Sequence, residues 1–435
     1  MMIFLILALF VVSGDVFFVF HVEGFTIRLF QLLIIPVIFV GVRKLWRDPR
    51  SKQWPIGYKS LLTWALFVLI FVPNTSFIPR NVGYMGWLLL NILLVIGITG
   101  AINTEAKLVH LLQWYIYSFA FCAVFGLVQF FAPLFGLPGL LVQQWWFPGL
   151  IARINGFNYE PSYYATYMLA GWILIDYLRY RKVVIVPGLN IIFGLVTVSI
   201  LLSTSRIGWL VMFVWFAVRV FWHFQESGIM VPWRAIILGG FSCAVLISLF
   251  MSHYGIAGED LSFLGSGLGL FGATTTHSSD TRIGTALDTL NVFFEHPIIG
   301  VSLGGVAPAI GGNRNDSIID QESTKDDEGT CVTAEVLAAS GIFGFIPFVL
   351  YMYGLMWTPI HLTDNSDLGL CVKALTWSLI MVFLALQFSP TILRAPFWLH
   401  IGILSAAYRV FRASQRSRRL VAALHQLQNP ATAVG

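Results

Sequence analysis

Four arginines lie at the ends of long apolar stretches, where their charge could bind an anion. They are Arg153, Arg206, Arg282 and Arg394, and Arg206 belongs to a short turn, Ser203-Thr-Ser-Arg-Ile-Gly208, between two such stretches. A guanidinium group donates two parallel, charge-assisted hydrogen bonds, so arginine is the side chain best suited to a phosphate. Together these side chains could bind a phosphate or pyrophosphate group, or each could instead pair with a loop carboxylate or a lipid headgroup.

Acidic and hydroxyl side chains accompany these arginines. Glu160 comes directly before Pro161 at the start of an apolar stretch, a position typical of helix capping. It could also orient Arg153 or take a proton from a substrate hydroxyl. The candidate catalytic residues are therefore Arg206, Arg282, Glu160 and Arg153. The candidate substrate-binding residues are Arg206, Arg282, Arg153, Arg394, Ser205 and Asp280.

Patterns for metal or nucleotide binding are weak in this sequence. The glycine-rich segment 267–272 fits a dinucleotide-binding pattern, but the strand, helix and distant acid that this motif needs are missing. His277, His296 and Cys331 lack the spacing of zinc ligands. The run Asp326-Asp327-Glu328 could hold a divalent ion through its oxygens, but such runs are usually solvated surface. We therefore expect neither a metal nor a cofactor.

The elements that must position these residues are membrane-spanning helices. The chain is 57% hydrophobic and only 11% charged, whereas soluble domains carry roughly 25% charged residues. Its apolar stretches have the length of a spanning helix, about 17–25 residues, and they lack the alternation of barrel strands. The sequence thus predicts an all-α polytopic membrane protein with about twelve transmembrane helices, at 2–20, 28–43, 58–73, 84–102, 107–131, 161–178, 183–202, 206–222, 234–252, 333–356, 371–389 and 395–410.

The distribution of Lys and Arg predicts the orientation of these helices, because basic residues stay on the cytoplasmic side. With both termini inside, 18 of the 26 basic residues are cytoplasmic. The high pI is then a topology signal, and no nucleic-acid binding is expected. The first stretch is interrupted by Gly14 and Asp15, and it lacks the basic start and small-residue cleavage site of a removed signal peptide.

The chain divides into four regions along this topology. Residues 1–252 hold the first nine spans, 253–332 form an outer loop, 333–410 hold the last three spans, and 411–435 form a cytoplasmic tail. The outer loop carries 11 acidic and three basic residues, and loops of this length often carry function. Part of it should be helical, from Arg282 to Glu295, because Ile283, Leu287, Leu290 and Phe294 fall on one stripe. Ser279 or Asp280 could cap this helix, and His296-Pro297 would end it.

Three segments resemble the O-antigen ligase and polymerase superfamily (the WaaL and Wzy type). They are Arg153-Ile-Asn-Gly-Phe-Asn-Tyr-Glu-Pro-Ser-Tyr-Tyr-Ala165, Ser203-Thr-Ser-Arg-Ile-Gly208, and Arg282 through Phe-Phe-Glu-His-Pro-Ile-Ile-Gly-Val-Ser-Leu-Gly304. A weaker fourth piece runs from Glu335 to Gly341-Ile-Phe-Gly344. Together they cover roughly residues 150–345, and their order and spacing are more specific than any one of them.

The resemblance implies a transferase of the GT-C type in the bacterial inner membrane. Its substrate would be an undecaprenyl-pyrophosphate-linked oligosaccharide at the periplasmic face, with Arg206 and Arg282 engaging the pyrophosphate. Membrane lipids and a chain-length regulator protein are the other partners that we expect. Glu160 is the first candidate for the base that activates the acceptor hydroxyl, followed by Asp280 and Glu328.

One departure from the family pattern favours a polymerase over a ligase. Ligases of this superfamily have a His-Asn pair twelve residues before the glycine that matches Gly341, counting inclusively, and here that place reads Thr330-Cys331. The Glu-Pro-Ser segment also resembles exopolysaccharide and capsule polymerases. A ligase that transfers glycan to lipid A core is the alternative. A transporter or flippase is a further alternative, but most charges lie at span ends rather than at the bilayer midplane.

The topology predicts which loops a membrane-impermeant thiol reagent can reach. In a variant without native cysteines, a cysteine replacing Asn315 should react in intact spheroplasts, because 253–332 is expected outside. A cysteine replacing Gln53 should react only after the membrane is opened, and it serves as the control. Protection of the Asn315 position until lysis would refute this orientation.

Overall fold

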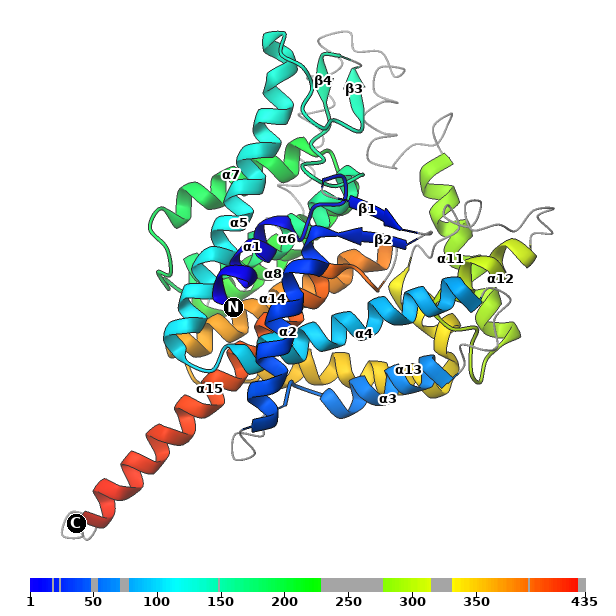
Figure 1. Ribbon diagram of the computed structural model, residues 1–435. Helices are drawn as coiled ribbons and strands as arrows, with labels where there is room; N and C mark the ends of the chain where they lie inside the picture. The colour runs from blue at the N-terminus through cyan, green and yellow to red at the C-terminus, as the bar shows by residue number, and fades with distance from the viewer. Residues whose placement is uncertain are drawn as a thin grey trace.

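The computed structural model describes residues 1–17, 19–22, 25–47, 54–70, 78–147, 149–227, 277–313, 331–389 and 392–428. Most of this chain is helical, and the helices pack into one bundle (Figure 1). We call the end of the bundle that carries the two β-hairpins and α11 the outer end, after the predicted topology, and the opposite end the inner end. The tail of the last helix extends away from the inner end (Figure 1).

Most predicted spans coincide with a helix, and the protein is an all-α polytopic membrane protein. The helices are α2 (Leu29–Arg47), α3 (Tyr58–Ile70), α4 (Ile78–Ala101), α5 (Glu105–Phe131), α6 (Pro161–Tyr180), α7 (Leu189–Leu202), α8 (Arg206–Ser227), α13 (Val332–Ile360), α14 (Asp367–Ala385) and α15 (Ala395–Gln428). Within the described residues, six helices are long and apolar enough to cross a membrane: α2, α4, α5, α8, α13 and α14. The predicted ninth span, 234–252, lies outside the described residues.

The predicted first span is wrong in its second half. Helix α1 (Met2–Val11) is short, and the chain then turns into an antiparallel hairpin of β1 (Val19–Val22) and β2 (Phe25–Arg28). The turn is held from outside, because the amides of Asp15 and Val16 both donate to the carbonyl of Phe157, at 2.9 and 3.0 Å. Asp15, which interrupts the apolar run, therefore lies in the turn after α1, at the outer end of the bundle.

The outer end also contains helices that do not span. The predicted helix after Arg282 is confirmed as α11 (His277–Glu295), which begins before Ser279 and Asp280, so neither caps it. The predicted apolar stripe is not the face that α11 buries: Leu287 is 56% and Phe294 71% exposed, whereas Thr285, Thr289 and Val292 are buried. Two short elements follow, η4 (Leu303–Gly305) and α12 (Val306–Asn313).

A kink in α13 joins this outer segment to the bundle. Gly341 has φ 57° and ψ −170°, a conformation that side chains rarely adopt. The kink leaves the carbonyls of Ala338 and Ala339 to accept hydrogen bonds from the amides of Val301 (3.0 Å) and Ser302 (2.7 Å). The third and fourth segments that resemble the ligase and polymerase superfamily are therefore joined through their backbones.

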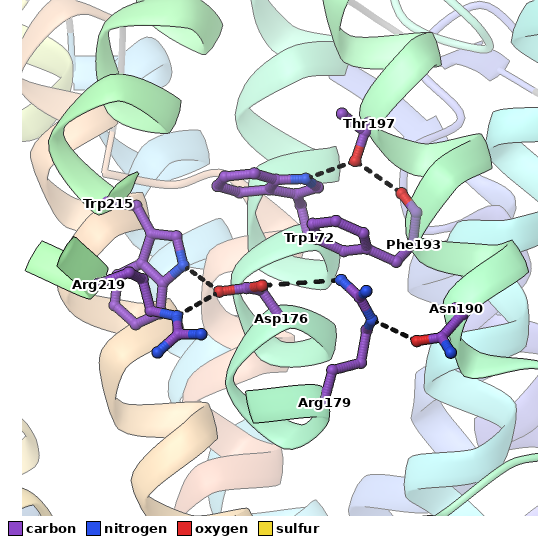
Figure 2. Close-up of polar contacts among 8 residues, drawn as sticks. All are labelled: Trp172, Asp176, Arg179, Asn190, Phe193, Thr197, Trp215 and Arg219. Carbon is purple, nitrogen blue, oxygen red and sulfur yellow. Dashed lines mark hydrogen bonds and ion pairs between the residues drawn. The ribbon is translucent and has the colours of Figure 1, made fainter. Parts of the chain in front are cut away.

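The inner halves of α6, α7 and α8 are joined around one carboxylate, as Figure 2 shows. Asp176 of α6 accepts hydrogen bonds from Trp215 Nε1 (2.9 Å) and Arg219 Nε (2.8 Å), both on α8. Arg179 lies 3.8 Å from the same carboxylate and donates to Asn190 of α7 at 2.7 Å. This acid within a membrane helix is thus neutralised by neighbouring arginines.

Small residues let α2 and α4 cross in close contact. A Cβ atom added to Gly97 of α4 would lie 2.7 Å from the Cα atom of Ile38 on α2, and one added to Gly41 would meet the backbone of Gly97. Glycines at such crossings allow helix backbones to approach within a membrane. Helix α15 packs along the same α4, so α4 lies between α2 and α15.

This crossing predicts the effect of an added methyl group. Gly97→Ala should lower the free energy of unfolding by about 1–3 kcal/mol, because the new carbon must displace backbone atoms. Gly86→Ala on the same helix is the control: nothing lies within 4 Å of its added carbon, and alanine is the better helix former. The thermal unfolding midpoint in detergent measures both, and a Gly97→Ala protein as stable as Gly86→Ala would contradict the crossing.

Candidate functional site

A cavity of about 320 Å³ lies in the outer half of the bundle, between α1, α2, α4, α6 and the start of α15. Its polar lining includes Asp15, Arg28, Asn91, Asn158 and Arg394. Aromatic side chains complete the wall, among them Tyr84, Trp87, Tyr159 and Tyr163. A cavity of this size, mostly apolar with a few converging polar groups, is typical of a small-molecule site.

Two arginines share one carboxylate in this cavity. Asp15 Oδ1 lies 3.2 Å from Arg28 Nη2, and Asp15 Oδ2 lies 3.1 Å from Arg394 Nη1. The Arg394 guanidinium also stacks 3.4 Å from the ring centre of Tyr163. The Nε atoms of both arginines are buried and have no hydrogen-bond partner among the described residues. This trio therefore carries an excess positive charge and unused donors, which suits an anion.

The turn before α15, which carries Arg394, is held in place by three contacts, two of them from distant helices. The buried carboxylate of Glu335 on α13 accepts the amide of Ile392 at 3.0 Å. Trp398 Nε1 donates to the Ile392 carbonyl at 2.7 Å, and Asn91 of α4 donates to the Leu393 carbonyl at 3.2 Å. An irregular backbone segment within a membrane bundle needs such partners, and here they aim Arg394 into the cavity.

Two buried amide side chains hold the loop between α5 and α6. Gln129 Oε1 accepts the amides of Asn155 (3.0 Å) and Gly156 (2.9 Å). Asn155 Nδ2 donates to the carbonyls of Leu141 (3.1 Å) and Asn158 (2.7 Å). These bonds fix the segment that brings Asn158 and Tyr159 to the cavity. The predicted residues Arg153 and Glu160 flank this segment in the sequence, but neither lines the cavity.

The structure engages Arg153 with the turn between α7 and α8. Its Nε donates to Thr204 Oγ1 at 2.7 Å, its Nη2 donates to the Thr204 carbonyl at 3.2 Å, and its Nη1 donates to Gln144 Oε1 at 2.8 Å. Thr204 has φ 51°, a conformation that costs a non-glycine residue about 1–3 kcal/mol and needs support from its surroundings. Arg153 gives that support and joins the loop to the turn.

The other predicted residues fall in three places. Arg206 is the first residue of α8 and is exposed, and Ser205 before it accepts the amide of Gly208 at 3.4 Å. Glu160 occupies the position before α6, where its carboxylate accepts the Ser162 hydroxyl at 2.7 Å and makes no capping bond to the backbone. Asp280 and Arg282 belong to the first turns of α11, and their side chains lie outside the described part.

The sequence analysis missed Asp15, Arg28 and Glu335 as site residues. The available signal was an acid inside an otherwise apolar first stretch, followed by an arginine at the start of the next stretch. In the described part of the chain, no three His, Cys, Asp or Glu side chains lie close enough to hold a metal ion. The acidic run 326–328 lies outside it, so the expectation of no metal there stays a prediction.

Removing the shared carboxylate should destabilise the outer end. Asp15→Asn leaves Arg28 and Arg394 without their anionic partner, and we expect a loss of about 1–3 kcal/mol in unfolding free energy. The double variant Asp15→Asn/Arg394→Gln should recover part of this loss, since one uncompensated charge is gone. The thermal midpoint in detergent is the measurement, with the exposed Asp367→Asn as the control. An Asp15→Asn midpoint equal to the wild-type value would refute the pairing.

Comparison with known proteins supports the resemblance described from the sequence. Residues 191–349 match the family model described as O-antigen ligase. No curated protein matches the chain. The matched part includes the turn at Thr204, Arg206, α11 and the first part of the kinked α13. This central part of the chain is therefore similar to the O-antigen ligase family, in agreement with the resemblance to the ligase and polymerase superfamily.

Proposed function

We propose that the protein polymerises undecaprenyl-pyrophosphate-linked oligosaccharide repeat units at the periplasmic face of a bacterial inner membrane. The product would be an O-antigen, capsule or exopolysaccharide. The observation that carries this proposal is the outer cavity, in which Arg28 and Arg394 face a space lined by aromatic and amide side chains. Guanidinium groups suit the pyrophosphate. Aromatic faces suit the C–H face of a sugar ring, and amides suit its hydroxyl groups.

The chemistry needs no external energy source. The acceptor hydroxyl oxygen would form a bond to the anomeric carbon of the donor chain, and the bond from that carbon to the pyrophosphate oxygen would break. The departing lipid pyrophosphate keeps the electron pair, so positive groups aimed at it would stabilise the transition state. Arg206 and Arg282, by resemblance, and Arg394, by its place in the cavity, are the proposed groups.

A base must take the proton from the acceptor hydroxyl. Glu160 is our candidate, because it is half-buried at the start of α6 and adjoins Tyr159 in the cavity wall. Its carboxylate accepts a hydrogen bond from Ser162, so it is ordered before a substrate arrives. Asp280 and Glu328 remain the next candidates in the outer loop.

A ligase is the second candidate, because the matching family model is described as O-antigen ligase. The polymerase is preferred because the sequence lacks the histidine that ligases have in their His-Asn pair: this position is Thr330, and Cys331 stands in place of the asparagine. Cys331 takes the position before α13, and its Sγ lies 3.4 Å from Gln387 Oε1. The thiol is thereby placed as a partner of a neighbouring amide, and the imidazole of the preceding residue is replaced by Thr330.

Purified protein in detergent should elongate lipid-linked repeat units into a ladder without ATP or nucleotide sugars. The same mixture is offered lipid A core as a second acceptor. Glycan joined only to lipid A core would identify a ligase. If folded protein makes neither product, a transporter or flippase would be favoured.

Within this assay, Arg206→Ala and Arg282→Ala should each slow polymer formation about 30- to 1,000-fold, which corresponds to roughly 2–4 kcal/mol of transition-state stabilisation. Arg→Lys at either position keeps the charge but loses the planar fork, so it should also be severely impaired. Arg314→Ala in the acidic loop is the control and should be near wild type. Wild-type turnover of both alanine variants, at equal amounts of folded protein, would defeat the pyrophosphate role even if polymer still formed.

A further inference from the structure

The inner end contains a second hollow, separate from the outer cavity. Its volume is about 430 Å³, and it lies between the inner ends of α2, α4 and α15. Arg43, Lys44 and Arg47 of α2 face it, together with Asn103 after α4 and Arg409 of α15. Four cationic side chains from two helices therefore meet at one concave place.

The close crossing of α2 and α4 brings these charges together. Gly41 and Gly97 let the two helices cross in close contact just before Arg43 and Lys44. The basic residues of α2 therefore line the same hollow as Asn103. Arg409 is fixed from the other side, because its Nη1 donates to the carbonyl of Thr99 at 2.6 Å. The hollow is thus built by tightly packed helices rather than by a loop.

Within the described residues, the three cations that α2 brings to this hollow are not paired with acids, unlike other cations at the inner end. On α6 and α8, Asp176 neutralises Arg219 (Figure 2), and Glu226 lies 2.8 Å from Arg181. In the described part of the chain, no ion pair joins Arg43, Lys44 or Arg47 to a carboxylate. Lys44 instead shares the hollow with the like charges of Arg43, Arg47 and Arg409. An anion at this place would relieve that repulsion.

An apolar track on α2 leads to the same place. Ile35 is 54% and Phe39 is 64% exposed, at the helical spacing that continues to Arg43. Trp46, 83% exposed, follows one turn later, and exposed tryptophans of membrane helices favour the headgroup level. An apolar stripe that ends in a cationic hollow matches an amphiphile with an anionic head, and not a free anion.

We propose that this hollow binds the phosphate headgroup of an anionic phospholipid, with an acyl chain along Ile35 and Phe39. Basic pockets between helices at a membrane surface bind such headgroups. The site lies at the opposite end of the bundle from the outer cavity, so the inference does not depend on which glycan reaction the protein catalyses. It assigns a function to cations that topology alone would treat as interchangeable.

Native mass spectrometry of the full-length protein in detergent tests this, with dioleoyl phosphatidylglycerol as the probe. Removing two cations in Arg43→Gln/Lys44→Gln should raise the apparent Kd for this lipid about 30-fold. The control Lys59→Gln/Lys182→Gln removes the same charge elsewhere at the inner end and should bind like wild type. Phosphatidylcholine should bind at least tenfold more weakly.

Three results would overturn the proposal. One is unchanged phosphatidylglycerol affinity in Arg43→Gln/Lys44→Gln. The second is an equal loss in the control variant, which would mean that only net charge matters. The third is displacement of the lipid by inorganic pyrophosphate at similar concentration, which would make the hollow a site for a soluble anion. Thermal midpoints of both variants establish that each is folded before its affinity is compared.

Discussion

Backbone polar groups that this bundle takes out of water need a partner within the protein, because the hydrocarbon layer offers none. The outer end meets this requirement with a few buried side chains that serve irregular backbone. Gln129 and Asn155 carry the loop before α6, and Glu335 carries the turn before α15. The cavity can therefore be surrounded by non-helical chain and still lie inside a membrane protein. Its shape depends on these three residues more than on the arginines that it displays.

The same requirement explains where the charges lie. Asp15 and Asp176 are both acids in apolar surroundings, and each is held by arginines from other helices. At the outer end the cations exceed the acid and border a cavity, so positive charge is left for a ligand. Around Asp176 the arginines and the Trp215 indole close on the carboxylate, and the cluster joins helices. Similar ion pairs thus border a cavity at one end of the bundle and join helices at the other.

Hydropathy was enough to predict most helices, because a span of fixed length needs only local apolar residues. It failed at the first span, where Asp15 turns the chain toward partners that are far away in sequence. The stripe on α11 was misjudged for a related reason, since the face that is buried depends on α13 and not on periodicity. The sequence singles out Arg394 as an arginine at the end of a span, but it does not predict the pairing with Asp15, because the two residues are separated by 379 positions. Contacts of that kind leave no local pattern.

That separation also has a consequence for biogenesis. The ribosome delivers Asp15 and Arg28 to the membrane long before Arg394, which follows only with α15. Until α15 inserts, one wall of the cavity is missing, and one oxygen of the Asp15 carboxylate lacks the partner that it has in the finished protein. Nascent chains would thus lack this arrangement of charges until α15 has been made and inserted.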